Sequence, residues 1–244
     1  QHSPSDRDDA VVYQATETTS QIQLDEFVDV AAETFPGITE IKQNWESLLG
    51  YLGDRDGVVV LDEFPYLIDA DESLPSVIQR LWDQRFQNTS GTLILVGSSI
   101  SMMEEATLLG NSPLYGRFTE KLDLRPLNFS AAQEFMPDSY SPEERIFTWG
   151  IFGGVPYYLD GVDLDQDLGA VLTAEVLSQK GYLHNEPEYV LRTELTDPNR
   201  YFAILTTIAA GKTTSNEIAQ AVGIDGKQIS TYTQKLERLR LIER

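Results

Sequence analysis

The chain has 244 residues, of which 41% are hydrophobic, so it can bury the core of one large domain or of two to three small ones. It has no cysteine and only two histidines, which excludes a disulfide scaffold, a cysteine nucleophile and a histidine-rich metal centre. No apolar run reaches the roughly 18 residues of a membrane span, and the first residues do not resemble a signal peptide. We therefore expect a soluble, cytoplasmic protein with no membrane partner.

Charge is the most distinctive feature of the composition. Acidic side chains outnumber basic ones by 39 to 18, and only six of the basic residues are lysine. This favours the hydrated acidic surface of a halophilic protein from a high-salt cytoplasm over that of an ordinary acidic protein. Residues 201–244 differ, because they carry six basic and four acidic side chains. The change of sign predicts a second domain with a different partner.

The first half of the chain alternates apolar strand-like runs with helical patterns. We expect strands at residues 11–13, 58–61, 92–96 and 121–124, and helices at residues 24–35, 38–52, 74–86 and 102–109. The run at residues 58–61 is apolar without interruption, which is typical of a strand buried on both faces of a parallel sheet. Strands separated by helices predict an α/β fold with right-handed crossovers.

The second half is expected to be helical. The pattern predicts helices at residues 130–135, 141–152, 168–179, 187–195, 201–210, 215–222 and 227–240. Ser130 and Ser141 are expected to cap the first two of these helices. The last three follow one another closely, with Gly223 at the turn before the final helix, which is the spacing of a helix-turn-helix.

Two adjacent carboxylates, Asp62 and Glu63, follow the buried run at residues 58–61. Ligands of parallel sheets bind at the edge formed by the carboxyl ends of the strands. In P-loop ATPases the first such acid holds Mg²⁺ and the second polarises the attacking water. Because successive strand residues point to opposite faces, the two acids are suited to different tasks. The alternative interpretation is a solvated pair of turn acids.

Three further polar groups lie near the predicted sheet edge. Ser98 and Ser99 follow the strand at residues 92–96, where a hydroxyl can contact the attacking water or simply cap the next helix. Arg117 precedes the expected strand at residues 121–124 and is a candidate for neutralising charge on a γ-phosphate. A structural ion pair with a nearby acid is the competing interpretation of Arg117.

Two glycine-containing segments are considered as candidates for contacts with a nucleotide. Gly154 and Pro156 form a turn between helices that could place an adenine against the proline ring, although the bare pattern indicates only a turn. Residues 211–213 read Gly-Lys-Thr, but Thr206 stands where a phosphate loop requires glycine. No buried strand precedes this segment, so we interpret it as a turn between two helices.

The final predicted helix carries groups suited to contacts with bases or phosphates. The DNA-binding candidates are Lys227, Gln228, Lys235, Arg238 and Arg240. The alternative is a helical module used only for protein packing.

Taken together, the motifs resemble the archaeal ATPase family of the AAA+/STAND type, over residues 10–244. The resemblance rests on VVVLDEFPYL, LILVGSSISMM, SPLYGRFTEKLDLRPLNF, GGVPYYL and the terminal helices. It implies a P-loop NTPase-type parallel sheet followed by a helical lid and a winged helix. It also implies Walker B roles for Asp62 and Glu63, a sensor role for Ser98 and Ser99, and nucleotide contacts at Gly154 and Pro156. Arg117 matches the glycine-arginine pair of the family.

One element of the family pattern does not occur in these 244 residues. The glycine-rich phosphate loop should precede the strand at residues 11–13, so the sequence looks like an internal fragment that lacks the central strand of its sheet. This missing strand is expected between the strands at residues 92–96 and 121–124, and ATP is not expected to stabilise the chain alone. Family members usually continue into a further, nuclease-like domain.

The resemblance implies three domains: an ATPase core at residues 1–129, a helical lid at residues 130–196 and a winged helix at residues 197–244. The implied activity is ATP hydrolysis with Mg²⁺, coupled to a module that binds duplex DNA. The main alternative is a catalytically inactive DNA-binding regulator that keeps the ATPase fold as a scaffold. A role in defence or in a mobile element is a third, and a protein client and a homo-oligomer stay open.

Overall fold

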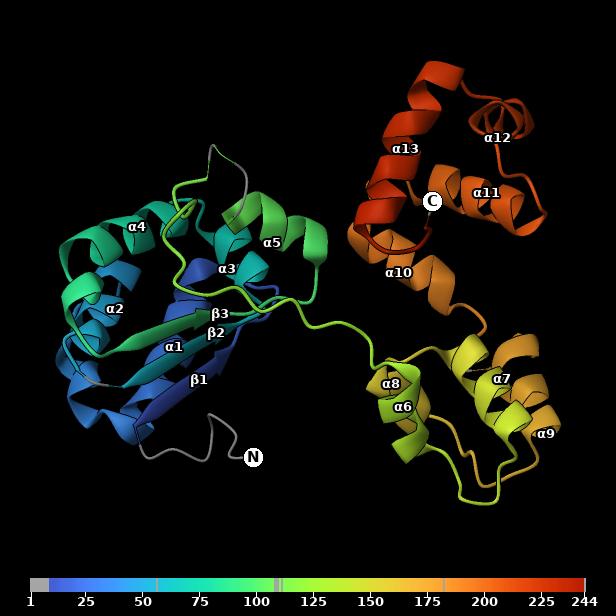
Figure 1. Ribbon diagram of the computed structural model, residues 1–244. Helices are drawn as coiled ribbons and strands as arrows, with labels where there is room; N and C mark the ends of the chain where they lie inside the picture. Colours follow the sequence, from blue (N-terminus) through green and yellow to red (C-terminus); the bar gives the residue numbers. More distant parts are fainter. Residues whose placement is uncertain (1–8, 56, 108–109, 111, 182, 244) are drawn as a thin grey trace. The chain divides into compact units, whose positions relative to one another are not determined.

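The computed structural model describes the chain except for residues 1–8, 56, 108–109, 111, 182 and 244 (Figure 1). The chain divides into two compact units, residues 1–120 and residues 121–244, and each is treated by itself. The first unit contains a small parallel sheet with helices, and the second is helical. No helix in the described part of the chain is both long enough and apolar enough to cross a bilayer.

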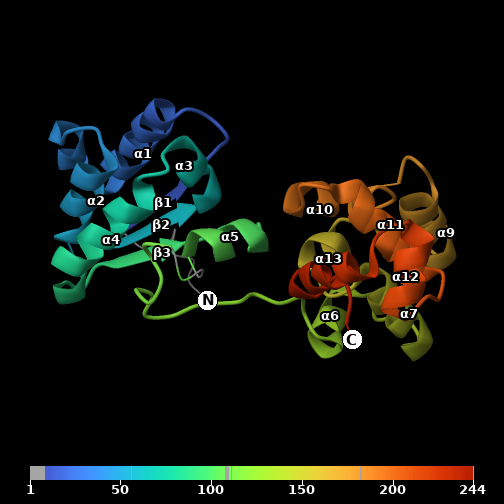
Figure 2. The same ribbon diagram turned by 90° about the horizontal axis from the view of Figure 1, so that it is seen from above.

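The sheet of the first unit has three parallel strands in the order β1-β2-β3, with β2 in the middle (Figure 2). The strands are β1 (Ala10–Gln14), β2 (Val58–Asp62) and β3 (Thr92–Leu95). The register aligns Val12 of β1 with Val60 of β2, and Val60 with Ile94 of β3. Val59, Val60 and Leu61 are all buried, as the continuous apolar run predicts.

Helices cover one face of this sheet. They are α1 (Ser20–Thr34), η2 (Pro36–Glu40), α2 (Trp45–Gly53), α3 (Phe64–Ala70), α4 (Leu74–Gln84), η3 (Phe86–Asn88) and α5 (Ile100–Thr107). Leu61 and Val59 point into a core that also contains Phe27 of α1 and Leu48 of α2. On the opposite face, Val12 and Ile94 are 39% and 37% exposed. The sheet is therefore covered much less completely on that second face.

The second unit begins with an extended segment and continues as a chain of helices. They are α6 (Phe129–Ala132), η4 (Gln133–Phe135), α7 (Pro142–Phe152), α8 (Pro156–Asp160), α9 (Leu168–Leu172), η5 (Thr173–Leu177), α10 (Glu186–Glu194), α11 (Pro198–Ala209), α12 (Ser215–Val222) and α13 (Gly226–Arg238). Phe152, Leu159 and Val171 belong to one small core. The last three helices pack as neighbours, α11 against α12 and α12 against α13.

The expected strand at residues 121–124 is wrong. The segment is irregular, and Leu122 and Leu124 are 79% and 90% exposed. An isolated segment gains no strand structure from apolar alternation, because a strand forms only when a neighbour accepts its backbone hydrogen bonds. Within the first unit, the described strand that pairs with β3 is β2.

Several helix boundaries also differ from the sequence expectation. The helix expected at residues 38–52 is interrupted between η2 and α2, because Asn44 accepts a hydrogen bond from the Ser47 N–H and starts a new helix. Asn128 rather than Ser130 caps α6. Ser141 does cap α7 and forms a capping box with Glu144. The expected helix at residues 102–109 starts earlier, at Ile100, and its expected end lies outside the described residues.

Candidate functional site

The carboxyl edge of the sheet brings the two predicted carboxylates together. Asp62 is the last residue of β2, and its Oδ1 accepts a hydrogen bond from the Glu63 N–H at 3.0 Å. The next residue, Phe64, is fully buried at the start of α3 and donates its N–H to the Val96 carbonyl at 2.8 Å. Asp62 and Glu63 are therefore fixed between a buried strand and a buried helix start.

Glu63 has an unusual backbone conformation, with φ of 52° in the left-handed region. This conformation costs a residue with a side chain about 1–2 kcal/mol. Strained backbone of this kind persists only where the surroundings determine it, and it gathers at functional sites. The chain thus keeps glutamate at a position where glycine would be more stable.

Ser98, which follows β3, contacts the Glu63 carboxylate directly. Glu63 Oε2 accepts a hydrogen bond from the Ser98 Oγ–H at 3.1 Å and one from the Ser98 N–H at 3.4 Å. Ser98 is exposed, and Glu63 is half-buried. The carboxylate is consequently oriented by the neighbouring strand and stays accessible to a ligand.

Ser99 has a different task, which the sequence alone could not distinguish. It is buried, and its Oγ accepts a hydrogen bond from the Met102 N–H at 3.3 Å in the first turn of α5. This is the contact of a helix cap. Ser98 is thus the serine candidate whose contact with the Glu63 carboxylate the structure describes.

Gln23 supports the same edge and was not predicted. It is fully buried on α1, and its Nε2 donates to the carbonyls of Thr16 at 2.9 Å and Tyr66 at 3.1 Å. These bonds connect the loop after β1 to the first turns of α3, next to Glu63. A polar residue beside Leu24 on an otherwise apolar helix face was the signal that could have revealed it.

Arg117 forms a two-pronged ion pair with Asp83 of α4. Its Nε donates to Asp83 Oδ1 at 3.0 Å and its Nη2 to Oδ2 at 2.9 Å, while Nη1 bonds the Pro113 carbonyl at 3.0 Å. This hydrogen-bonded guanidinium holds the pKa of the Asp83 carboxyl below its usual range. The contacts are those of a structural arginine, so a role at a phosphate stays a prediction.

Gly154 and Pro156 lie in the second unit, where they shape a tight turn. The Gly154 carbonyl accepts from the Leu127 N–H at 2.7 Å, and a Cβ at Gly154 would lie 1.9 Å from the Leu127 oxygen. Only glycine fits so close to another backbone. Pro156 occupies the first turn of α8, where its missing N–H costs nothing. Their packing explains both residues, and their adenine contact stays a prediction.

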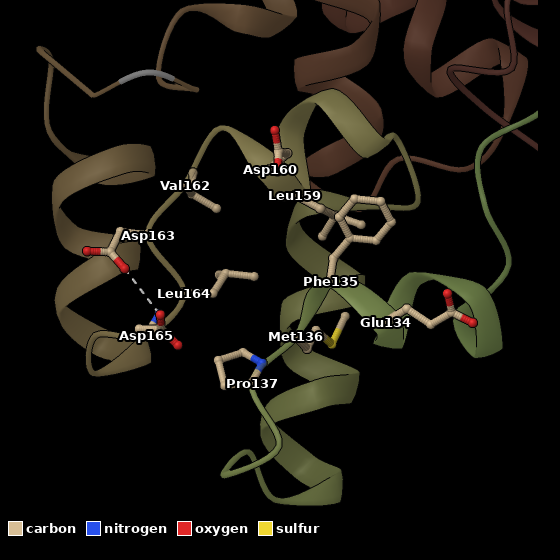
Figure 3. A pocket seen from close by; sticks show the side chains of 10 residues that line it. All are labelled: Glu134, Phe135, Met136, Pro137, Leu159, Asp160, Val162, Asp163, Leu164 and Asp165. Atoms are coloured by element: carbon tan, nitrogen blue, oxygen red, sulfur yellow. Dashed lines mark hydrogen bonds between the residues drawn. The ribbon is translucent and has the colours of Figure 1, made fainter. Parts of the chain in front are cut away.

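A hollow of about 450 Å³ in the second unit has an acidic rim (Figure 3). Four carboxylates line it, those of Glu134, Asp160, Asp163 and Asp165, and apolar side chains such as Leu159 line the rest. Carboxylates and phosphates are both negatively charged and repel each other, so this hollow is unsuited to the phosphates of a nucleotide.

The DNA-binding candidates lie on α13 and just after it. Ile229, Thr233 and Leu236 form the buried face of this helix. Lys227, Gln228 and Arg238 are exposed, and Lys235 is half-buried. Gly223 ends α12 in the left-handed conformation, as expected for the turn of a helix-turn-helix. Strands of a wing do not occur among the described residues that follow α13.

Arg240, the last of these candidates, has a positive φ and an acidic partner. It has φ of 59° just beyond α13, and its guanidinium forms an ion pair with Asp123, which precedes α6. Residues 211–213, which read Gly-Lys-Thr, form the predicted turn, in which Gly211 has positive φ. Thr214 then caps α12 in a capping box with Glu217.

A parallel sheet with two carboxylates and a serine at its carboxyl edge is an α/β arrangement whose ligands bind at that edge. The chain belongs to the family described as an ATPase domain predominantly from Archaea, whose sequence profile matches residues 4–162. This agrees with the archaeal ATPase resemblance of the sequence.

Two individual proteins are similar to the chain. An uncharacterized protein of Methanocaldococcus jannaschii, MJECL04, is 35% identical over 221 residues, which are 91% of this chain and 49% of that protein. The chain thus spans about half the length of this curated relative. The structure of the Walker-type ATPase PABY2304 of Pyrococcus abyssi matches with a TM-score of 0.62 and 17% identity, over 94% of this chain and 77% of that chain. This similarity supports the fold.

Proposed function

We propose that the protein binds and hydrolyses ATP at the carboxyl edge of the sheet. The observation that carries the proposal is the convergence of three predicted groups: Asp62, Glu63 in a strained backbone, and Ser98 on the Glu63 carboxylate. Membership of an ATPase-domain family supports it.

The chemistry of Asp62 suits Mg²⁺. This ion favours oxygen ligands and is usually held by one or two carboxylates together with substrate phosphates. No three acidic or histidine side chains of the described residues, those of the acidic hollow included, are arranged to hold a metal ion by themselves. When bound, the ion would neutralise charge that develops on the phosphates.

Glu63 is suited to orient and polarise the water that attacks the γ-phosphate, and Ser98 would hold its carboxylate in place. A general base must lie within hydrogen-bond reach of its proton, directly or through one water. The accessible position of Ser98 and Glu63 at the sheet edge meets this need. Ser98 would act through Glu63 as a positioning residue.

The phosphate loop would come from a further strand beside β3. Two observations support this extension: β3 is an edge strand, and the sheet face bearing Val12 and Ile94 is poorly covered. A strand followed by a helix would pair with that edge and cover that face, and a helix N-terminus binds phosphate well. Without this loop, ATP is expected to leave the melting temperature of the 244-residue chain unchanged.

Gly154, Pro156 and Arg117 would complete the site if nucleotide binding moves a helical lid at residues 130–196, as in STAND-type AAA+ proteins. Residues 197–244 would then form a winged helix that responds to the nucleotide and binds duplex DNA. Lys227, Gln228, Lys235 and Arg238 on α13 support this part of the proposal. The competing function is a DNA-binding regulator that does not hydrolyse ATP.

The full-length protein tests hydrolysis directly. Glu63→Gln should retain nucleotide binding and lose about 10²–10⁴ in turnover, because it removes the carboxylate that polarises water. Glu72→Gln is the matched control, since Glu72 is an exposed acid outside the sheet edge. Unchanged turnover in Glu63→Gln would overturn the role given to Glu63, and no turnover in the wild type would favour the non-hydrolysing regulator.

The DNA-binding part needs its own measurement. The anisotropy of a labelled duplex should rise with added protein at low salt. Lys235→Gln and Arg238→Gln should each reduce the slope of log K against log salt by about one. Lys180→Gln, an exposed lysine outside α13, should leave the slope unchanged. If the wild type does not bind at low salt, the helices serve protein packing instead.

A further inference from the structure

A group of basic side chains surrounds Asp123 in the second unit. The Arg240 guanidinium forms a hydrogen-bonded ion pair with Asp123 Oδ2, and Arg125 Nε lies 3.6 Å from the same oxygen. The Arg240 hydrogen bond holds the pKa of the Asp123 carboxyl below its usual range, and the charges of Arg125 and Lys121 act in the same direction. Two arginines thus lie beside one carboxylate, and Lys121 is two residues away along the chain.

This concentration of positive charge is unusual for the chain. The protein carries 39 acidic and 18 basic side chains, so cations generally have an excess of acidic neighbours. Around Asp123 the ratio is reversed, and the group is accessible, since the Arg125 side chain is 74% exposed and that of Asp123 43%. An accessible group of cations with a net positive charge is suited to a phosphate backbone.

The backbone of Arg240 gives separate support. Arg240 follows the end of α13 with φ of 59°, and the Leu241 N–H donates to the Leu236 carbonyl at 2.9 Å. This is a helix end at which glycine is the usual residue. The chain has arginine there despite the strain, which points to a task for the side chain.

We propose that Lys121, Arg125 and Arg240 form a cluster that contacts DNA phosphates and extends the basic face of α13. While no DNA is bound, Asp123 holds the Arg240 guanidinium in an ion pair. This inference rests on the proposed DNA binding. A carboxylate and a phosphodiester both accept paired hydrogen bonds from a guanidinium. Asp123 therefore competes with the phosphate for Arg240 and repels the duplex.

The Asp123 charge can be removed without removing the cations. In the full-length protein at about 50 mM salt, Asp123→Asn should bind a labelled duplex roughly tenfold more tightly, because one phosphate contact no longer has a competitor. Asp160→Asn changes the net charge equally on the rim of the acidic hollow, away from the three cations of the cluster in the sequence, and should change affinity less than about twofold.

Two further variants test the cluster itself. Lys121→Gln and Arg125→Gln should each lower the slope of log K against log salt by about 0.9. In the absence of DNA, NMR titration of Arg240→Gln should show that the Asp123 pKa rises towards its usual value.

The outcomes separate this inference from the proposed function. If the wild type binds DNA and Asp123→Asn gains no more than Asp160→Asn, the competition is wrong while DNA binding stands. If Asp123→Asn binds DNA and the wild type does not, the proposed competition is supported, and Asp123 prevents DNA binding entirely in the wild type. If neither the wild type nor Asp123→Asn binds, both proposals fail.

Discussion

Glu63 and Arg240 have the same backbone conformation in contrasting surroundings. They are the two residues other than glycine with positive φ in the described part of the chain, at 52° and 59°. Glu63 lies between β2 and α3 in the first unit, next to the buried Phe64. Arg240 lies at an exposed helix end in the second unit.

The difference lies in what supports each conformation. Around Glu63, backbone hydrogen bonds reach both neighbouring strands, since the Ala15 N–H donates to the Asp62 carbonyl and the Phe64 N–H to the Val96 carbonyl. Around Arg240 the support is a helix end and one long-range ion pair with Asp123. A site for chemistry needs the rigid arrangement, whereas a site that exchanges partners can use the looser one.

The largest expected effect concerns the Glu63 side chain. In the full-length protein, Glu63→Gly and Glu63→Ala should both lose about 10²–10⁴ in ATP turnover, because neither has a carboxylate. The free energy of unfolding of Glu63→Gly should nevertheless exceed that of Glu63→Ala by about 1 kcal/mol, because glycine adopts positive φ without strain. Turnover assays and urea unfolding measure the two effects. Equal stability of the two variants would show that the Glu63 backbone is unstrained.

The second prediction compares the roles of Ser98 and Ser99 through their alanine variants. Ser98→Ala should lower turnover about tenfold, as expected when one hydrogen bond that orients a catalytic group is lost, and should hardly change stability. Ser99→Ala should keep turnover and lose about 1 kcal/mol of stability, because a helix cap is removed. Ser98→Thr keeps the hydroxyl and should restore most of the rate. A larger turnover loss in Ser99→Ala than in Ser98→Ala would reverse the assignment.

A third pair of variants isolates the backbone of Arg240. Arg240→Gly and Arg240→Ala both lose the ion pair with Asp123, so their difference reports the backbone alone. Glycine should be more stable by about 1 kcal/mol, as at other helix ends of this kind. Denaturant unfolding of the 244-residue chain measures this difference, and an advantage for alanine would contradict it.

The smallest effect concerns Arg117 and Asp83, an arginine–aspartate pair without strained backbone. The pKa of Asp83 is lowered in the folded state from 3.8 by its hydrogen bonds to Arg117. A lowered pKa contributes stability above the unfolded value, and this contribution is lost as pH falls through the folded value. Asp83→Asn should therefore melt slightly below the wild type at pH 6, and the gap should close below pH 4. A gap that does not change with pH would mean that it does not arise from the Asp83 charge, and no gap at all would mean that the pair adds nothing.

The sequence allowed the sheet edge to be predicted better than the rest of the site. The continuous apolar run of β2 identified a strand buried on both faces, and the position of Asp62 and Glu63 followed from it. Ser98 and Ser99 could not be separated, because their tasks depend on which way the chain turns after β3. The bond between Arg240 and Asp123 joins residues 117 apart in sequence, and no local pattern indicates such a partner.

The predictions that failed also depended on contacts beyond the local sequence. Residues 121–124 have the alternation of a strand, yet a strand also requires a neighbour, which the segment itself cannot specify. Short polar side chains moved the helix starts, as at Asn44 and Asn128, because such caps compete with one another along the chain. The high-salt interpretation of the acidic surface stays a prediction.

The open edge of β3 has a consequence for handling the 244-residue chain. An edge strand is a template on which another chain can add its own strand. Thr92, Leu93, Ile94 and Leu95 offer no charge and no proline to prevent this, and Ile94 leaves apolar surface beside the edge. Concentrated samples should therefore aggregate through β3, and a lysine in place of Ile94 should keep them dispersed.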